Sequence, residues 1–130
     1  MRIVVDTSVI IAVIAGESEK ELLIRRTVGA ELMAPESLHW EVGNALSAQM
    51  KRGRLLRAQV PVLLRAYNQI PVQFVEVSLE AALEIAGDLG TYAYDAYMLA
   101  AALKYRVPLL TLDRGLVAAA ERAGVDVLEV

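Results

Sequence analysis

The stretch Ile3-Val4-Val5-Asp6-Thr7-Ser8 decides the fold, because a strand, an acid and a helix start follow one another within it. Three consecutive β-branched residues favour a buried strand. Helical spacing of apolar residues begins directly afterwards and predicts a helix over Ser8–Ala15. The stretch therefore predicts a strand that passes straight into a helix, with Asp6 at the junction.

The rest of the chain repeats this order. Further short apolar runs predict strands at Leu32–Ala34, Phe74–Val77, Leu109–Leu112 and Val125–Val130. Longer segments with helical periodicity lie between them, at Ser18–Val28, Ser37–Arg52, Arg57–Gln69, Leu79–Leu89, Ala93–Tyr105 and Arg114–Ala123. Strands separated by helices form βαβ units and hence a parallel sheet. The right-handed crossover rule then predicts a single α/β domain over residues 1–130, a three-layer α/β/α sandwich with a mostly parallel five-stranded sheet.

The composition excludes several classes of protein. With 130 residues, 56% of them hydrophobic and 22% charged, the chain is neither intrinsically disordered nor a coiled coil. It has no cysteine, which excludes disulfides and thiolate zinc sites, and its one histidine, His39, cannot form a histidine cluster. The longest apolar run, Val9–Ala15, is far shorter than the ~20 residues of a membrane span. We read the first residues as part of the fold rather than as a secretory leader, and we expect a cytoplasmic protein.

Four acidic residues fall where a parallel sheet would bring them together. Asp6 and Asp113 each follow a predicted strand, and the carboxyl ends of parallel strands share one edge of the sheet, where ligands bind. Asp95 lies in the first turn of its predicted helix. Glu41 lies among the apolar positions of the helix over residues 37–52, and Asn44 follows one turn later on the same face.

Each acid taken alone also has a structural explanation. Asp6 and Asp113 are suited to capping the helices that follow them. Asp95 is an acid of the kind that the helix dipole favours near an N-terminus. Glu41 is harder to explain in this way, because an unpaired carboxylate that faces a core is costly. The four together favour one shared site over four unrelated roles.

Carboxylates that gather in this way repel one another and raise one another's pKa unless a cation lies between them. Without cysteine or a second histidine, all candidate ligands are hard oxygen atoms, which suit Mg²⁺ or Mn²⁺. We therefore predict that the four carboxylates share Mg²⁺ or Mn²⁺. Such an ion polarises a phosphate and activates water, so the predicted reaction is hydrolysis of a phosphodiester bond.

Four short segments carry a resemblance to a known family; they are Val4–Ser8, Glu41–Leu46, Tyr94–Ala96 and Leu110–Asp113. In their order and approximate spacing they resemble the acidic motifs of PIN domains and, more narrowly, of the VapC toxins of toxin–antitoxin pairs. The resemblance covers the whole chain. It implies that the four acids of the family correspond to the ones named above, Asp6, Glu41, Asp95 and Asp113.

The resemblance also implies roles for neighbouring residues and for partners. It places Ser8 and Thr111 where the family supports its site and Asn44 near the second acid, so these three join the acids as candidate catalytic residues. It further implies a Mg²⁺-dependent endoribonuclease, a homodimer or a dimer of dimers, silenced by a VapB-type antitoxin. Where the residues match the family pattern, no acid is missing.

A basic interval offers a place for RNA. The net charge of −3 argues against a protein that coats nucleic acid through bulk positive charge. Between Glu41 and Glu76 there is no acid, and five basic residues give this interval a charge of +5, while the rest of the chain carries −8; they are Lys51, Arg52, Arg54, Arg57 and Arg65. We predict that the first four contact the RNA backbone. The alternative is a solvated helix end whose cations complement the helix dipole.

Aromatic and apolar residues near these positions have simpler explanations. Trp40, which precedes Glu41, could stack on a base, but we expect it to pack in the core or in a subunit interface. We expect His39 to be half-exposed. The apolar stripe Val9–Ile14 is expected to bury against the sheet, with a groove for an antitoxin helix as the alternative.

Other classes of protein fit less well. A phosphoacceptor receiver domain needs paired acids after the first strand, an acceptor aspartate after the middle strand and a lysine after a late strand. This chain has a single acid, Asp6, then Ser78, then Asp113 at those places. A haloacid-dehalogenase-type phosphatase needs a second acid where Ser8 stands. A noncatalytic PIN-like interaction domain stays open as an alternative.

Overall fold

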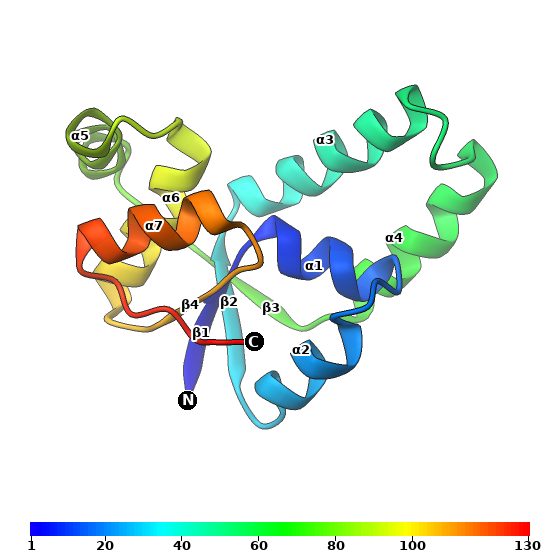
Figure 1. The fold of residues 1–130 in the computed structure, drawn as a ribbon, viewed down its shortest axis with the longest axis horizontal. Coiled ribbons are helices and arrows are strands. Elements are labelled where there is room, and N and C mark those ends of the chain that lie inside the picture. Colours follow the sequence, from blue (N-terminus) through cyan, green and yellow to red (C-terminus); the bar gives the residue numbers. More distant parts are fainter.

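The computed structural model describes residues 1–130 and has one parallel sheet at its centre (Figure 1). Its strands lie in the order β3-β2-β1-β4; they are β1 (Arg2–Val5), β2 (Glu31–Pro35), β3 (Val72–Val75) and β4 (Leu109–Leu110). Every pairing between them is parallel. β1 lies inside the sheet, and its apolar run Ile3–Val5 is fully buried, as expected for a strand covered on both faces.

Helices cover both faces of this sheet. They are α1 (Thr7–Ile14), α2 (Lys20–Thr27), α3 (Ser37–Lys51), α4 (Val60–Gln69), α5 (Leu79–Leu89), α6 (Ala93–Tyr105) and α7 (Arg114–Ala123), with a short 3₁₀ helix, η1 (Arg57–Gln59), before α4. On one side α1 contacts α2, α3 and α4; on the other, α6 lies against β1, β2 and β4 and contacts α5 and α7 (Figure 1). The predicted three-layer α/β/α arrangement is therefore confirmed. None of these helices combines the length and the apolarity that crossing a bilayer requires.

The predicted fifth strand is wrong. The segment Val125–Val130 forms only an isolated bridge, in which Val127 pairs with Leu109. β4 itself is two residues long, because the amide groups of Leu112 and Asp113 donate to side-chain hydroxyls instead of continuing a ladder. The last residues of the chain therefore find almost no strand to pair with, and the sheet has four strands.

Two other element boundaries differ from the prediction for local reasons. β3 begins and ends two residues earlier than the predicted Phe74–Val77, because it pairs in register with β2 and stops where that strand ends, at Pro35. The helix predicted over Arg57–Gln69 is divided into η1 and α4. Pro61, in the first turn of α4, has no N–H to donate to the preceding turn, so a continuous α-helix cannot form there.

The apolar stripe of α1 is explained by burial. Every residue of the stripe Val9–Ile14 except Val13 is buried, and the buried residues belong to the main hydrophobic core. The expectation that this stripe packs against the sheet is confirmed. Burial of this surface holds α1 in place directly behind the junction at Asp6.

α3 and α4 form a hairpin that projects beyond the sheet (Figure 1). α3 has 15 residues and is therefore about 22 Å long at 1.5 Å per residue. Its first turn follows β2 at the carboxyl edge of the sheet, and its last turn lies at the projecting end, which we call the hairpin tip (Lys51–Arg57). α3 thus connects the edge of the sheet with the hairpin tip.

Candidate active site

Asp6 is the most buried of the candidate acids, at 6% exposed, because it lies between the end of β1 and the start of α1. Its Oδ1 accepts hydrogen bonds from Ser8 Oγ at 2.6 Å and from the Val9 amide at 3.2 Å, and the latter caps α1. Its Oδ2 accepts a hydrogen bond from Thr111 Oγ1 at 2.5 Å. A carboxylate oxygen has two acceptor positions, so Oδ2 keeps one of them for a cation.

Two hydroxyl groups tie this carboxylate to the loop that follows β4. Ser8 Oγ accepts a hydrogen bond from the Leu112 amide at 2.9 Å, and Thr111 Oγ1 accepts one from the Asp113 amide at 3.0 Å. These bonds hold the loop after β4 against the junction of β1 and α1. The structure therefore brings Ser8 and Thr111, both predicted to support the site, into direct contact with Asp6.

Asp113 is exposed and forms the cap of α7. Its Oδ1 accepts hydrogen bonds from the amides of Gly115 at 2.8 Å and Leu116 at 3.3 Å. A Cβ atom at Gly115 would lie only 3.2 Å from that oxygen, so glycine permits the close approach of the carboxylate. The other oxygen, Oδ2, accepts no hydrogen bond from the protein and is available to a ligand.

Glu41 and Asp95 come from helices on opposite sides of the sheet. Glu41 is half-buried in α3, and its Oε2 accepts a hydrogen bond from Thr7 Oγ1 at 3.2 Å. Asp95 is half-buried in the first turn of α6, and none of the hydrogen bonds in the structure ends on its carboxylate. Sequence analysis did not identify Thr7 as a site residue. The feature that could have identified it is a hydroxyl residue directly after the acid that ends the first strand.

Burial and mutual repulsion raise the pKa values of three of these acids. Burial is the main cause for Asp6, Glu41 and Asp95, and it raises the pKa of Glu41 to about 7. The charge of Asp113 raises the pKa of Asp6 and Asp95 further, and the charges of Asp6 and Asp95 raise that of Glu41. These pairwise effects link all four carboxylates, Asp6, Glu41, Asp95 and Asp113, which we call the acidic region.

The chemistry of this region suits a small divalent cation. No group of three or more acidic or histidine side chains stands close enough together to hold a metal ion without other ligands, as a closed cage would. Mg²⁺ does not require such a cage, because it binds through one or two carboxylates and keeps water or substrate phosphate oxygens as its other ligands. An open set of oxygen donors with raised pKa values, including the unused acceptor position of Asp6 Oδ2, fits this ion.

The other predicted site residues lie outside the acidic region. Asn44 is exposed on α3, and its side chain makes no hydrogen bond to any of the four acids. The basic residues predicted to contact RNA are all exposed at the hairpin tip; they are Lys51, Arg52, Arg54 and Arg57. Lys51 lies ten residues after Glu41, which places it about 15 Å further along the helix axis. The roles assigned to these residues stay predictions.

The expectation that Trp40 packs in the core is wrong. Its side chain is 70% exposed, because it projects from the outer surface of α3 next to β3 and not toward the sheet. It meets the ring of His39 edge to face, with 4.9 Å between ring centroids. His39 is exposed rather than half-exposed, and it contacts Tyr67, whose hydroxyl lies 3.2 Å from His39 Nδ1.

Solved structures with a similar fold come from archaea and bacteria. PAE2754 from Pyrobaculum aerophilum is 25% identical, with a TM-score of 0.70 over 92% of this chain and 87% of that one. VapC20 from Mycobacterium tuberculosis, a toxin that cleaves the sarcin–ricin loop, is 20% identical, with a TM-score of 0.64 over 90% and 94% of the two chains. A toxin–antitoxin complex from Klebsiella pneumoniae is 16% identical, with a TM-score of 0.53 over 85% of each chain.

The family can be assigned from the sequence match. No curated protein sequence matches the chain. The family model of the PIN domain matches residues 3–122, which is nearly the whole chain and includes all four acids. The protein therefore belongs to the PIN domain family, as the resemblance of its acidic motifs implies.

Proposed function

We propose that this protein is a Mg²⁺- or Mn²⁺-dependent endoribonuclease that hydrolyses RNA phosphodiester bonds and acts as the toxin of a type II toxin–antitoxin pair. The observation that supports the proposal is that three acids, Asp6, Glu41 and Asp95, have raised pKa values, with burial as the main cause and the charge of a neighbouring acid as a further one. PIN domains are typically metal-dependent nucleases, which supports the same reaction class. Membership of this family leaves the receiver-domain alternative without support.

The contacts of each acid suggest its role. Asp6 would bind the ion through Oδ2, with its orientation fixed by Ser8 and Thr111. Asp95, whose carboxylate accepts no hydrogen bond from the protein, would be the second direct ligand. Glu41 and Asp113 would complete the site directly or through water. When bound, the ion polarises the phosphate and activates the attacking water. Thr7 orients the Glu41 carboxylate, which has a pKa of about 7 and is suited to exchanging a proton with water near neutral pH.

The partners follow from the surface and from the relatives. The hairpin tip, with Lys51, Arg52, Arg54 and Arg57, is suited to the RNA backbone because its cations are exposed and the sequence from residue 42 to residue 75 contains no acid. The structural relative from Klebsiella pneumoniae is a toxin–antitoxin complex. We therefore propose a VapB-type antitoxin as a protein partner and a homodimer, or a dimer of dimers, as the assembly.

A noncatalytic interaction domain is the second candidate, and one observation favours it. Asp6 and Asp113 both cap helices, so the fold would keep these two acids even if the site had no activity. This explanation does not extend to Asp95, because its carboxylate accepts no hydrogen bond from the rest of the protein. Variants of Asp95 therefore separate the two candidates.

The test is cleavage of a structured RNA by the purified protein with Mg²⁺, with Mn²⁺ and with EDTA. We expect cleavage only with a divalent ion, and a loss of at least about 100-fold in Asp95→Asn and Asp6→Asn, since the ion contributes several kcal/mol to catalysis. Asp88→Asn, which removes an exposed acid from α5, is the matched control and should cleave normally. Cleavage that persists in EDTA, or in Asp95→Asn, would contradict the proposal.

A further inference from the structure

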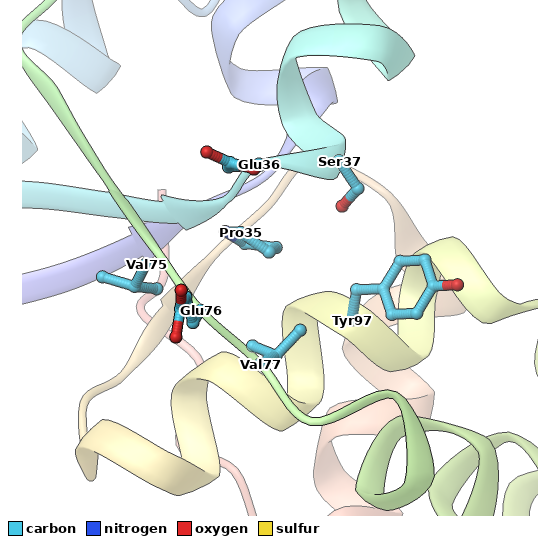
Figure 2. Close-up of a pocket in the computed structure, with 7 residues that line it drawn as sticks. All are labelled: Pro35, Glu36, Ser37, Val75, Glu76, Val77 and Tyr97. Atoms are coloured by element: carbon cyan, nitrogen blue, oxygen red, sulfur yellow. The ribbon is translucent and has the colours of Figure 1, made fainter.

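Two hollows share a lining residue where β2 ends and α3 begins. The first has a volume of about 380 Å³ and lies between the ends of β2 and β3 and helix α6; Figure 2 shows Pro35, Ser37 and Tyr97 around it. The second has a volume of about 280 Å³ and is lined by Glu36, His39, Trp40 and Phe74. Glu36 lines both hollows, so they meet at this residue.

Both hollows are tied in sequence to the candidate metal ligands. Ser37, in the first hollow, lies four residues before Glu41 and therefore on the same side of α3, about one helical turn away. Tyr97, in the same hollow, follows Asp95 by two residues on α6. Trp40, in the second hollow, directly precedes Glu41. Both hollows are therefore lined by residues of the helices that carry Glu41 and Asp95, although none of the four acids lines either hollow.

Trp40 presents a flat apolar surface that the protein does not cover. It is the only tryptophan of the chain and is 70% exposed. The planes of Trp40 and His39 meet at 85°, so the two rings do not stack face to face. His39 is held on its other sides by the Tyr67 hydroxyl and by Phe74, whose ring stands at 89° to it. Trp40 therefore rests against a fixed ring while its own surface stays open to a ligand.

The polar groups around the hollows favour a nucleobase over a phosphate. Glu36 and Glu76 carry carboxylates that repel phosphate and can accept hydrogen bonds from base amino groups. The Ser37 hydroxyl is buried without a hydrogen-bond partner and points into the space between Pro35 and Tyr97 (Figure 2). Flat apolar walls with a few hydrogen-bonding groups match an unpaired base, with the RNA backbone outside the hollows.

Charge complementarity indicates where that backbone runs. Trp40, Asn44, Ser47 and Lys51 are all exposed and follow one another at intervals of three or four residues, so they form one stripe along α3. The stripe begins at the second hollow and ends at the basic hairpin tip. A strand with its base against Trp40 could therefore lay its phosphates along α3 toward these cations.

We propose that Trp40 is a stacking platform for an unpaired RNA base, so that the protein selects single-stranded RNA over duplex RNA. Its place beside the cleaved bond rests on the proposed function; the stacking itself does not. A base in a duplex is already stacked and paired, and it cannot reach a ring in a hollow without being unpaired. Trp40 then acts as a binding and specificity residue on α3, the helix that also carries Glu41.

The sole tryptophan makes the test direct. In EDTA, where the proposed reaction is off, the tryptophan emission is followed as a single-stranded RNA oligonucleotide is added, and then as a blunt duplex of the same sequence is added. We expect saturable quenching by the single strand and little by the duplex. Stacking on an aromatic ring contributes about 1–3 kcal/mol per base, so Trp40→Leu should weaken single-strand binding by about 5- to 150-fold, as measured by anisotropy of a labelled strand.

Two further variants control for loss of apolar surface. Trp40→Phe keeps an aromatic ring and should retain most of the affinity, and Leu83→Ala, which trims an exposed apolar residue of α5, should bind like the original protein. Unquenched emission at saturating single strand, equal quenching by the duplex, or unchanged affinity of Trp40→Leu would each overturn the proposal. A tryptophan emission that changes with protein concentration in the absence of RNA would also overturn the proposal, because it would show that a second copy of the chain covers Trp40.

These outcomes are independent of the cleavage test. Quenching by single-stranded RNA together with no metal-dependent cleavage would support the stacking platform and reject the nuclease. Metal-dependent cleavage that disappears in Asp95→Asn, together with no quenching, would do the reverse. Binding is measured in EDTA and cleavage with the divalent ion, so the failure of one proposal is distinguishable from the failure of the other.

Discussion

The two halves of the acidic region differ in what holds their carboxylates. On the strand side, Asp6 accepts three hydrogen bonds and Asp113 accepts two, and each caps the helix that follows it. On the helix side, Glu41 accepts one hydrogen bond and Asp95 accepts none. The strand-side acids therefore serve the fold as well as the site, whereas the helix-side acids are half-buried with little compensation.

This difference teaches that helix capping and ligand binding are not exclusive explanations for an acid. The capping explanation considered from the sequence is correct for Asp6 and Asp113, yet both carboxylates keep an acceptor position for a ligand. The Asp95 carboxylate accepts no hydrogen bond in the fold, so a substitution of Asp95 tests the activity of the site with the least effect on stability. Substitutions of Asp6 or Asp113 are expected to affect both the stability of the fold and the activity of the site.

The largest expected difference concerns stability after removal of one carboxylate from each side. Asp6→Ala should lower the free energy of unfolding by about 2–4 kcal/mol, because it removes a helix cap and leaves the Ser8 and Thr111 hydroxyls without their acceptor. Asp95→Ala should lower it by less than about 1 kcal/mol, the contribution of an acid near a helix N-terminus. Urea unfolding in EDTA measures both. Equal decreases would show that the two sides do not differ.

The hydroxyl groups that orient the acids should show the same asymmetry on a smaller scale. Thr111→Val removes the donor to Asp6 and the acceptor for the Asp113 amide, and should cost about 1–3 kcal/mol, while Thr111→Ser should restore most of the stability. Thr7→Val removes a single, partly exposed bond to Glu41 and should cost about 1 kcal/mol or less. Thermal unfolding at equal pH compares the three variants, and a larger decrease in Thr7→Val would reverse the ranking.

The raised pKa values predict how stability depends on pH without a metal. The pKa of Glu41 is about 7 in the folded protein against an ordinary 4.5, so the folded state binds its proton more tightly than the unfolded state. The stability that this proton contributes is present below the ordinary pKa and is lost as the pH rises through about 7. Burial moves the pKa of Asp6 and Asp95 in the same direction.

Chemical unfolding at about pH 5 and about pH 8 in EDTA measures this dependence. We expect the protein to be less stable at the higher pH by about 1–2 kcal/mol from Glu41, after allowance for screening of a half-buried group. Glu41→Gln should flatten the difference, and Mn²⁺ should restore stability at the higher pH because it binds only the folded state. Stability that rises with pH in EDTA and is insensitive to Glu41→Gln would contradict the raised pKa.

The smallest expected effect lies at the hairpin tip, far from the acids. Arg52→Ala with Arg54→Ala should weaken RNA binding several-fold and lower the salt dependence of the affinity by about 0.7 for each phosphate that the protein no longer neutralises. Arg25→Ala, in an exposed position of α2, is the control and should change neither. An unchanged salt slope in the double variant would remove the hairpin tip from the RNA path and leave the acidic region unaffected.

Much of this molecule can be predicted from sequence because the decisive signals are local. β-branching at Ile3–Val5, the acid at Asp6 and the helical spacing that follows act within a few residues of one another. The alternation of strands and helices then leaves a parallel sheet as the topology, and it places Asp6 and Asp113 at the same edge. The three layers and the two strand-end acids follow from these local signals, and the resemblance of the four acidic motifs indicates the family.

Only the tertiary structure decided the contacts between distant segments. Thr7 meets Glu41 across 34 positions of sequence, and Thr111 meets Asp6 across 105. The hydrogen bonds that the Leu112 and Asp113 amides donate to side-chain hydroxyls shorten β4, which leaves Val125–Val130 without a full strand partner. The packing of α3 turns Trp40 toward solvent. Periodicity and capping specify how a segment folds on itself; which surfaces then meet depends on packing energies summed over the whole core, and no single stretch of sequence carries that sum.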